Sequence, residues 1–502
     1  MPGSAAVSRA FPGTLCNALL SKRKVTIGKR VTSPIVRNLN ANWLFVAFFK
    51  PYQRKCSGLS SPAKINGDDQ RIFGSHRGDS MSQKGFWTYE NKLLFILAVS
   101  FGFAFFDRNA ISYLSTYLVH DLGLSNKQVG LLGSALSLSW AFSALIIGRW
   151  SDALGKRKPF LIGILFVFSG CSVLSGLATN FHTLFAARLI MGIAEGPMMP
   201  ICLSILAVES SPSRRGLNIG IVQSLLASLL GGAIAPVVLV QLATWFSWRA
   251  AFFIAGIPGI ICALMIMRFV HEPKAIPEPE KKIEDGAGGI NKLAFFSERN
   301  IWLCALIACV MVSWLMLHQM FLPLFFNKIR HYTEQQGSWI MSVAGVCSMI
   351  SGFIAAGISD RIGRKPVIVT ACLLSMLTPL SALYFHGSIA ALATLMFIGW
   401  VGTAAFSLFL SVVPGETLPA RYAATASGLV VCIGEIVGGA GSQFIGGWAA
   451  DLTTQAAPIQ IAAGCALVGT ILSLFLKETA PVKIKVAPQN IVEAEPQCCS
   501  VE

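Results

Sequence analysis

Residues 148–159 read GRWSDALGKRKP, a short basic loop that leaves one long apolar run and enters the next. A shorter form of this loop, SDRIGRKP, returns at residues 359–366, 208 positions later when counted from Ser151 to Ser359. A second loop, ESSPSR at 209–214, is restated as ETLPAR at 416–421, at an offset of 207. Because two different loops recur at nearly the same offset, the chain is expected to consist of two related halves.

The apolar runs around these loops have the length of membrane spans. Of the 502 residues, 54% are hydrophobic and only 13% are charged, and the mean hydropathy is +0.63, which excludes an ordinary soluble protein. A helix of about twenty apolar residues crosses the roughly 30 Å hydrocarbon layer. We therefore predict an all-α membrane protein with twelve transmembrane helices in two six-helix bundles, at 91–117, 128–148, 160–178, 181–208, 216–245 and 250–269, and at 301–326, 336–357, 367–385, 389–414, 422–448 and 459–476.

These spans divide the chain into five segments. A basic tail (1–90) precedes the N-terminal bundle (91–269), and a linker (270–300) leads to the C-terminal bundle (301–477) and a last tail (478–502). The linker contains HEPKAIPEPEKKIEDGAGG, whose Pro, Glu, Lys and Gly content does not pack a core. We expect it to join the two bundles on one side of the membrane.

The net charge of +16 is concentrated in the N-terminal tail. Residues 1–80 hold 13 Lys or Arg and 3 Asp, which accounts for +10 of it. The tail resembles an organellar transit segment, which would place the protein in a plastid or mitochondrial envelope. Alternatively, translation starts at Met81, directly before the first span, and the upstream residues play no part.

The basic loops predict the orientation of the spans. Lys and Arg of short loops stay in the cytoplasm, and most of them lie after the second, fourth, sixth, eighth and tenth spans. Both termini and the linker are therefore predicted to be cytoplasmic. Without a transit segment, the expected location is the plasma membrane or a bacterial inner membrane.

The loop Gly148-x-x-x-Asp152-x-x-Gly155-Lys156-Arg157 and its second copy resemble the signature loop of the major facilitator superfamily. Within that superfamily, three motifs are similar to those of the anion:cation symporter family: Asp107-Arg108, Arg188-x-x-x-Gly192-x-x-Glu195-Gly196-Pro197, and Arg214-Arg215-Gly216. That family includes bacterial sugar-acid and organic-anion proton symporters, sialin and phosphate carriers. Residues 143–148 read SALIIG where sugar-acid members usually have a Gln and a Pro-Gly pair, so recognition of sugar hydroxyls is not carried over.

The resemblance implies a secondary transporter that works by alternating access. We expect proton-coupled symport of a small organic anion, with an exporter, an antiporter or a phosphate carrier of the same superfamily as alternatives. The expected partners are the anion, protons and the lipid bilayer, the protein is expected to be monomeric, and no cofactor or metal is implied. Nucleic-acid binding is not expected, because the basic tail lacks regularly interleaved aromatics. An enzyme is not expected either, because the sequence contains no metal-binding or nucleophile motif.

Four charged residues fall inside predicted spans, where each costs at least about 2.5 kcal/mol to insert. Asp107 and Arg108 lie in the first span and are expected to face the cavity or each other. Arg188 and Glu195 lie two helical turns apart in the fourth. An Arg guanidinium offers paired donors that match a carboxylate or a phosphate, so Arg108, and after it Arg188, are the candidate substrate-binding residues. Glu195 and then Asp107 are the candidate proton carriers. The alternatives are that Arg188 pairs with one of these acids, or that all four form structural ion pairs.

Weaker candidates complete the predicted substrate site. Trp140 and Gln223 match positions that line the cavity in the family, although an aromatic in a membrane helix is more often packing. His318 either titrates near neutral pH or is solvated near the outer loop. Glu435 lies in a glycine-rich stretch that suggests close helix packing, and the sequence assigns it no role.

The two signature loops are expected to latch one conformation. The carboxylates of Asp152 and Asp360 would contact a neighbouring helix N-terminus or the basic cluster. The latch residues carried over from the family are Asp152, Gly155, Arg157, Asp360, Gly363 and Arg364. Alternatively, the basic residues of these loops only set the topology.

Overall fold

The computed structural model describes residues 88–273 and 298–483, apart from residue 419. The chain divides into two units, Met1–Asp79 and Ser80–Glu502, and all described residues lie in the second unit. The predicted transit segment, most of the predicted linker and most of the C-terminal tail therefore lie outside the described residues.

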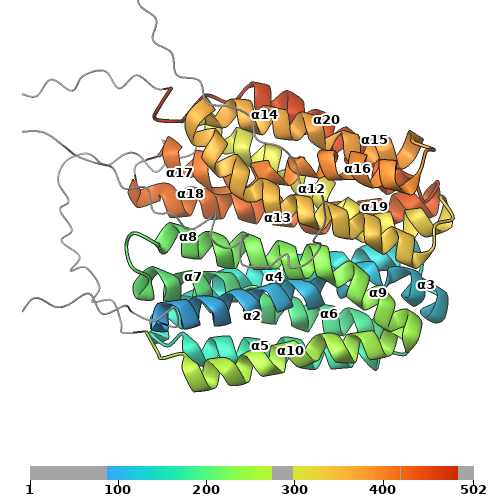
Figure 1. The fold of residues 1–502 in the computed structure, drawn as a ribbon, viewed down its shortest axis with the longest axis horizontal. Helices are drawn as coiled ribbons and strands as arrows, with labels where there is room; N and C mark the ends of the chain where they lie inside the picture. Colours follow the sequence, from blue (N-terminus) through green and yellow to red (C-terminus); the bar gives the residue numbers. More distant parts are fainter. Residues whose placement is uncertain (1–87, 274–297, 419, 484–502) are drawn as a thin grey trace, which may run out of the picture. The chain divides into compact units, whose positions relative to one another are not determined.

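The first half of the chain forms one bundle (Figure 1, blue to green). Its first four spans are α2 (Tyr89–Tyr113) continued by α3 (Ser115–Leu122), α4 (Asn126–Leu154), α5 (Lys158–Gly176), and α6 (Phe181–Glu195) continued by α7 (Met198–Glu209). The last two are a composite of α8 (Arg215–Gly220), η1 (Ile221–Leu225), η2 (Ala227–Ile234) and α9 (Ala235–Trp245), and then α10 (Trp248–Phe269).

The second half forms a second bundle beside the first (Figure 1, yellow to red). Its first three spans are α12 (Arg299–Lys328), α13 (Glu334–Ile362), and α14 (Arg364–Ser375) continued by α15 (Leu377–Tyr384). The fourth comprises α16 (Ile389–Trp400), η3 (Val401–Ala405), η4 (Leu408–Val412) and α17 (Val413–Thr417). The fifth comprises α18 (Ala420–Ile433), η5 (Gly434–Gly441) and α19 (Ser442–Leu452), and the sixth is α20 (Ala457–Leu474).

These helices confirm the predicted fold. Within the described residues, eleven helices are long and apolar enough to cross a membrane. The twelfth span is α13, whose arms Glu334–Gly352 and Ile354–Ile362 meet at 41°. The sequence did not predict the π-helical turns of η1, η2, η4 and η5, which interrupt three of the spans.

Each bundle has two ends, which we call the linker end and the far end. The linker end is where α4 and α10 finish and α12 begins, and the far end is where α4 begins and α19 finishes. At the far end, several spans begin with a capping residue whose side chain accepts a hydrogen bond from the backbone N–H three residues later. These caps are Asn180, Ser247, Thr333 and Ser388. These caps fix where the returning helices begin.

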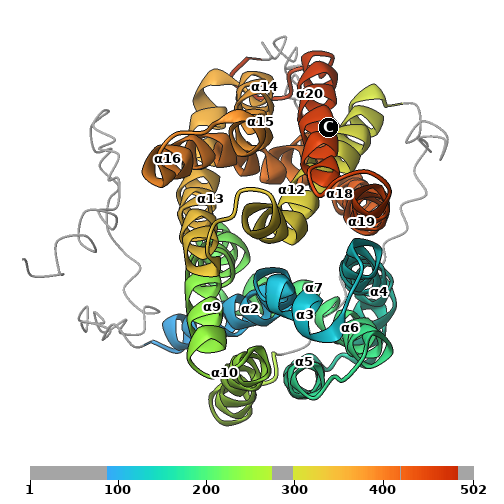
Figure 2. The same ribbon diagram turned by 90° about the vertical axis from the view of Figure 1, so that its right-hand side faces the viewer.

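The buried apolar residues form two clusters. One belongs to the linker-end part of the first bundle, with Leu97, Phe168 and Ile205 among its members. The other fills the second bundle and continues into the far-end part of the first bundle, through Ala110 and Leu239. Seen end-on in Figure 2, α4 lies against α19 and α9 lies against α13. The two bundles thus share an apolar core toward the far end.

Candidate functional site

A cavity lies between the two bundles, about halfway along the spans. With its open mouth it measures about 360 Å³. The first bundle lines it with Arg108, Asn109, Ser137 and Arg188, and the second bundle contributes Gln319 and Gln443. Both predicted substrate-binding arginines therefore reach the same inter-bundle space.

Arg108 presents its guanidinium to this cavity and is only partly buried. The guanidinium carbon lies 5.5 Å from the ring centre of Trp140 and 5.7 Å from that of Phe105. Within the described residues, the guanidinium has no hydrogen bond and no ion pair. Two aromatic faces hold the side chain in place by cation–π contact, and its five N–H donors remain open to an anion.

Arg188 is completely buried and is tied to its neighbour. Its Nη1 donates to the Arg108 carbonyl oxygen at 3.1 Å and lies 3.3 Å from the Met191 sulfur. Its Nε and Nη2 have no hydrogen-bond partner among the described residues. No ion pair to Asp107 or Glu195 is formed within 4.0 Å in the described structure, although both acids act on it electrostatically. Arg188 thus fixes the backbone that carries Arg108.

Asp107 points away from the cavity, which differs from the expectation that it faces the cavity or Arg108. Its Oδ1 accepts a 2.6 Å hydrogen bond from Ser172 Oγ of α5, and its side chain is fully buried. Consecutive residues on a helix are about 100° apart, so Asp107 and Arg108 cannot share one face. Its Oδ2 has no described partner.

Glu195 ends α6, directly before the break at Gly196 and Pro197. Its side chain is 5% exposed, and Oε1 has no described hydrogen-bond partner. Arg108, Asp107 and Arg188 all act on it electrostatically, Arg108 most strongly. Glu195 is therefore a buried acid with an unused oxygen beside the candidate anion site.

The two weaker candidates of the first bundle differ. Trp140 contacts the Arg108 guanidinium directly, as described above. Gln223 lies in the π-helical turn η1, is partly buried, and forms no hydrogen bond with the described residues. The geometry therefore brings Trp140, but not Gln223, into contact with the candidate anion site.

His318 is fully buried in α12, so the interpretation as a solvated residue near the outer loop is wrong. Its Nδ1 lies 2.5 Å from the Trp314 carbonyl oxygen. The centre of its ring lies 5.0 Å from the ring centre of Trp314 and 6.0 Å from that of Trp400. The α12 helix runs through the core of the second bundle, and position along the chain did not reveal this. Nε2 has no described partner.

Sequence reasoning missed Gln443 of α19. Its Nε2 donates to Ser137 Oγ at 3.1 Å and to the Gly439 carbonyl at 3.0 Å, so it joins the bundles at the cavity wall. Its signal was an amide inside a glycine-rich apolar run. Such a residue inside a membrane span usually faces a partner helix or a cavity.

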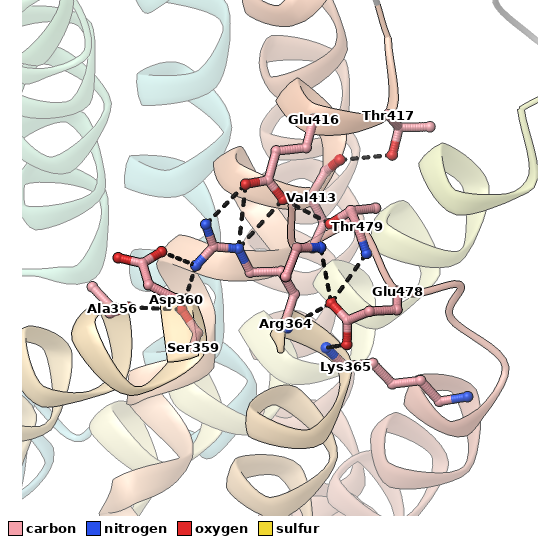
Figure 3. Close-up of polar contacts among 11 residues, drawn as sticks. Ala356, Ser359, Asp360, Arg364, Lys365, Val413, Glu416, Thr417, Glu478 and Thr479 are labelled. Atoms are coloured by element: carbon pink, nitrogen blue, oxygen red, sulfur yellow. Dashed lines mark hydrogen bonds and ion pairs between the residues drawn. The ribbon is translucent and has the colours of Figure 1, made fainter. Parts of the chain in front are cut away.

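The second signature loop folds into a charged cluster at the linker end (Figure 3). The Arg364 side chain donates to Asp360 at 2.5 Å, to Ser359 at 2.6 Å, and to Glu416 at 2.9 Å from Nη2. Thr479 donates to the other Glu416 oxygen at 2.7 Å. The E-x-x-P-x-R loop thereby supplies the acid that pairs with the signature loop of the same half.

Glu478, which follows the last span, caps the helix that begins in this loop. Its carboxylate accepts from the backbone N–H of Arg364 at 2.7 Å and of Lys365 at 3.1 Å (Figure 3). Burial raises the pKa of Glu478, but these bonds and two more from Ala480 and Thr479 outweigh it, so the pKa lies below its usual range. Gly363 permits this approach, because its φ is 111° and a side-chain carbon there would lie 2.5 Å from Oε2.

The first signature loop is built in the same way. Gly155 has a φ of 62°, and Glu272 accepts from the backbone N–H groups of Arg157 and Lys158. Glu272 and Glu478 are 206 residues apart, close to the offset of the loops, so the repeat itself carried the signal that we missed. Asp152 lies in the last turns of α4, but its side chain is outside the described part of the structure.

The far end carries a contact that crosses between the bundles. The Asp451 carboxylate of α19 accepts from the backbone N–H of Asn126 at 2.9 Å and of Lys127 at 2.8 Å, the first two residues of α4. Ser125 accepts from the next N–H, that of Gln128. The start of α4 is therefore capped partly from within and partly from the other bundle.

Comparison with known proteins agrees with this architecture. The family model described as Major Facilitator Superfamily matches residues 97–442 and, in a second match, 320–493. The chain belongs to the major facilitator superfamily. This confirms the resemblance drawn from the signature loops, and the protein is a multi-pass membrane transporter of this superfamily and not an enzyme.

Individual relatives in the superfamily are distant. The chain is 29% identical to a hexuronate transporter of Bacillus subtilis (strain 168) over 54% of its own length and 67% of the relative. It is 26% identical to a probable 4-methylmuconolactone transporter of Cupriavidus pinatubonensis over 78% of its length and 90% of the relative. A solved bacterial homolog to the human lysosomal transporter Spinster shares the fold, with a TM-score of 0.63 and 18% identity over 78% of this chain and 96% of that one.

Proposed function

We propose that this protein is a proton-coupled symporter that carries a small organic anion, with a carboxylate group, by alternating access. The observation that carries the proposal is the Arg108 guanidinium, which faces the inter-bundle cavity with no described counter-ion. A guanidinium that stays charged and keeps its donors free matches a carboxylate. Relatives named as carriers of hexuronate and of 4-methylmuconolactone support an organic-acid substrate.

Coupling to protons is supported by the acids around Arg108. Glu195 has an unused, buried oxygen and feels the charge of Arg108, and Asp107 lies on the other side of α2. When an anion occupies Arg108, the cation attracts Glu195 less, so Glu195 takes up a proton more easily. Substrate and proton then bind cooperatively, with Glu195 as the first carrier and Asp107 as the second.

Alternating access is supported by a contrast between the two ends: described contacts join the two bundles at the far end, whereas the described charged cluster at the linker end stays within one bundle. We propose that both termini and the linker are cytoplasmic, in the plasma membrane or, if residues 1–80 are a transit segment, in an organelle envelope. The far end, where Asp451 joins the bundles, is then the outer side. The six signature-loop residues, expected from the sequence to latch one conformation, are proposed to hold the linker end of each bundle together, because the described contacts of Arg364 stay within the second bundle. The carrier is proposed to work as a monomer.

The first test is uptake of labelled D-glucuronate into proteoliposomes with about pH 5.5 outside and about pH 7.5 inside, within a panel of mono- and dicarboxylates, aromatic acids and phosphate. We expect the gradient to drive uptake of one class of anion and Arg108→Ala to reduce it at least about tenfold, because a charge-assisted pair is lost. Arg268→Ala is the matched control, since Arg268 is exposed at the linker end of α10. Undiminished uptake in Arg108→Ala would contradict the proposed site.

The second test separates proton coupling from binding. In Glu195→Gln we expect gradient-driven accumulation of the transported anion to be lost, while exchange of labelled for unlabelled anion without a gradient persists. The missing proton carrier stops only the net cycle. Glu209→Gln is the control, because Glu209 lies at the linker end of α7 and forms no hydrogen bond or ion pair with the described residues. Intact pH dependence in Glu195→Gln would sink the assignment.

A further inference from the structure

Glu435 is a partly buried acid of the second bundle that the proposed function does not use. It lies in η5, where the fifth span of that bundle leaves regular α-helical geometry. Its Oε2 is buried and has no hydrogen-bond partner among the described residues. Single π turns in membrane or soluble helices occur frequently at functional sites. A buried acceptor without a partner costs free energy unless a ligand or water supplies a donor.

The carboxyl group of Glu435 lies beside the wall of the cavity. A methyl group placed on Gly439, one turn later, would lie 2.8 Å from Glu435 Oε2 and 3.6 Å from Ser137 Oγ. Ser137 belongs to α4 of the first bundle and lines the cavity. The missing side chain at Gly439 therefore leaves the space through which the Glu435 carboxyl group faces the first bundle.

Among the described residues, one cation acts on Glu435. Arg108 of α2 acts on it electrostatically across the bundle boundary. The α12 helix packs against η5 and presents the Cys309 thiol, which lies 3.8 Å from the Ile433 carbonyl oxygen. The α4 helix presents Ser137 and α19 presents Gln443, which bond to each other. Arg108 thus lies in the fields of Glu195 from its own bundle and of Glu435 from the other.

We propose that Glu435 is a specificity-determining residue supplied by the second bundle. It accepts a hydrogen bond from a donor group, hydroxyl or ammonium, on the anion whose carboxylate Arg108 binds, and it disfavours a second carboxylate at that position. This role rests on the proposed function. One substrate then bridges the two bundles, with its anionic end on the first and its donor on the second.

The physical basis is the opposite sign of the two groups. A substrate hydroxyl replaces water at the unpartnered Glu435 oxygen, whereas a substrate carboxylate brings a second negative group next to the Glu435 carboxylate. Sites built to pair with a hydroxyl reject analogues that leave the protein group unpaired. Glu435 therefore favours hydroxylated or aminated monocarboxylates over dicarboxylates of the same skeleton.

The test compares D-gluconate with D-glucarate, which share six carbons and four hydroxyls and differ only in a terminal hydroxymethyl or carboxylate. Each acid is added as a competitor while proteoliposomes take up labelled D-glucuronate. For the wild type we expect D-gluconate to compete at least about tenfold more strongly. In Glu435→Gln we expect this preference to fall about tenfold, since the amide neither repels a carboxylate nor carries charge.

A second variant guards against misfolding. Gly439→Ala places a methyl group 2.8 Å from Glu435 Oε2 and so displaces the carboxyl group, and we expect the same loss of preference. An unchanged preference in both variants, with uptake retained, would overturn the role of Glu435 and leave the proposed function standing. If the wild type responds to neither acid, the role is also wrong, and the anion panel alone decides the proposed function.

Discussion

The two ends of the molecule are held together in different ways. Toward the far end, three hydrogen-bonded contacts join residues of different bundles. Asp451 binds the start of α4, Ser134 donates to the Ala440 carbonyl at 2.6 Å, and Gln335 donates to Thr244 at 2.9 Å. The backbones also approach closely there, since a side-chain carbon on Gly345 would overlap the backbone of Gly232.

At the linker end, the described clusters join elements of the same bundle. Arg364 pairs with Asp360 and Glu416 inside the second bundle, and Glu272 caps α5 inside the first. Contacts between bundles must break when access alternates, whereas contacts within a bundle persist through the cycle. From this comparison we infer that the far-end contacts act as a reversible lock and that the linker-end clusters act as permanent fasteners of each bundle.

The largest expected effect comes from breaking a fastener. Glu416→Gln removes the carboxylate that pairs with the mostly buried Arg364 and leaves that cation without its second acid. We expect a loss of about 3 kcal/mol in the stability of the second bundle. Thermal unfolding of the purified protein in detergent measures it. The matched control is Glu209→Gln, at the repeat-related position of the first bundle, and equal melting of both variants would contradict the assigned fastener.

A smaller effect is expected from opening the lock. Asp451→Asn weakens two hydrogen bonds between bundles and a favourable contact with a helix N-terminus, so the far end opens more often. We expect the population of the far-end-open state to rise about tenfold, which corresponds to about 1.4 kcal/mol. Spin labels at Asn180 and His386, in a cysteine-free background, measure the separation of the bundles at this end.

The control for the lock is Asp121→Asn. Asp121 also lies at the far end, but it accepts from Arg249 at 2.6 Å and from Trp248 at 3.0 Å within the first bundle. The hydrogen bond from Arg249, more than that from Trp248, lowers the pKa of Asp121. Its substitution should leave the label distances unchanged. A shift as large as that of Asp451→Asn would mean that any lost charge at this end loosens the bundles.

The smallest expected effect concerns Glu478 and pH. Its pKa in the folded protein lies below the ordinary value of 4.5, so its contribution to stability is complete above that value and is lost as the pH falls through the lower, folded pKa. Near neutral pH, Glu478→Gln should therefore lower the free energy of unfolding by about 1 kcal/mol, because the group is partly exposed. Thermal unfolding in detergent measures this as a lower melting temperature. The difference should shrink as the pH falls below 4.5 and vanish once the pH lies below the folded pKa. A difference independent of pH would exclude the carboxylate as its source.

The sequence predicted the spans, and it placed Arg108 and Arg188 toward an internal space, for a simple reason. Membrane spans follow from continuous apolar runs, and a charge inside such a run must face a cavity or a partner. Arg108 in the cavity follows directly from that rule. The outward turn of Asp107, the burial of His318 and the capping by Asp451 do not, because they depend on α5, α12 and α19, whose positions relative to these residues are set by tertiary packing.

The capping carboxylates also bear on the order in which the contacts of the two bundles form during translation. Glu272 follows α10 directly, so the first bundle has its complete linker-end fastener before any residue of the second bundle is synthesised. The cap on α4 needs Asp451, 325 residues after Asn126. During translation, then, the start of α4 waits with two backbone N–H groups unsatisfied by this partner until the second half is nearly complete. The lock is thus among the last parts of the protein to form, and the first half has its Glu272 cap before the lock closes.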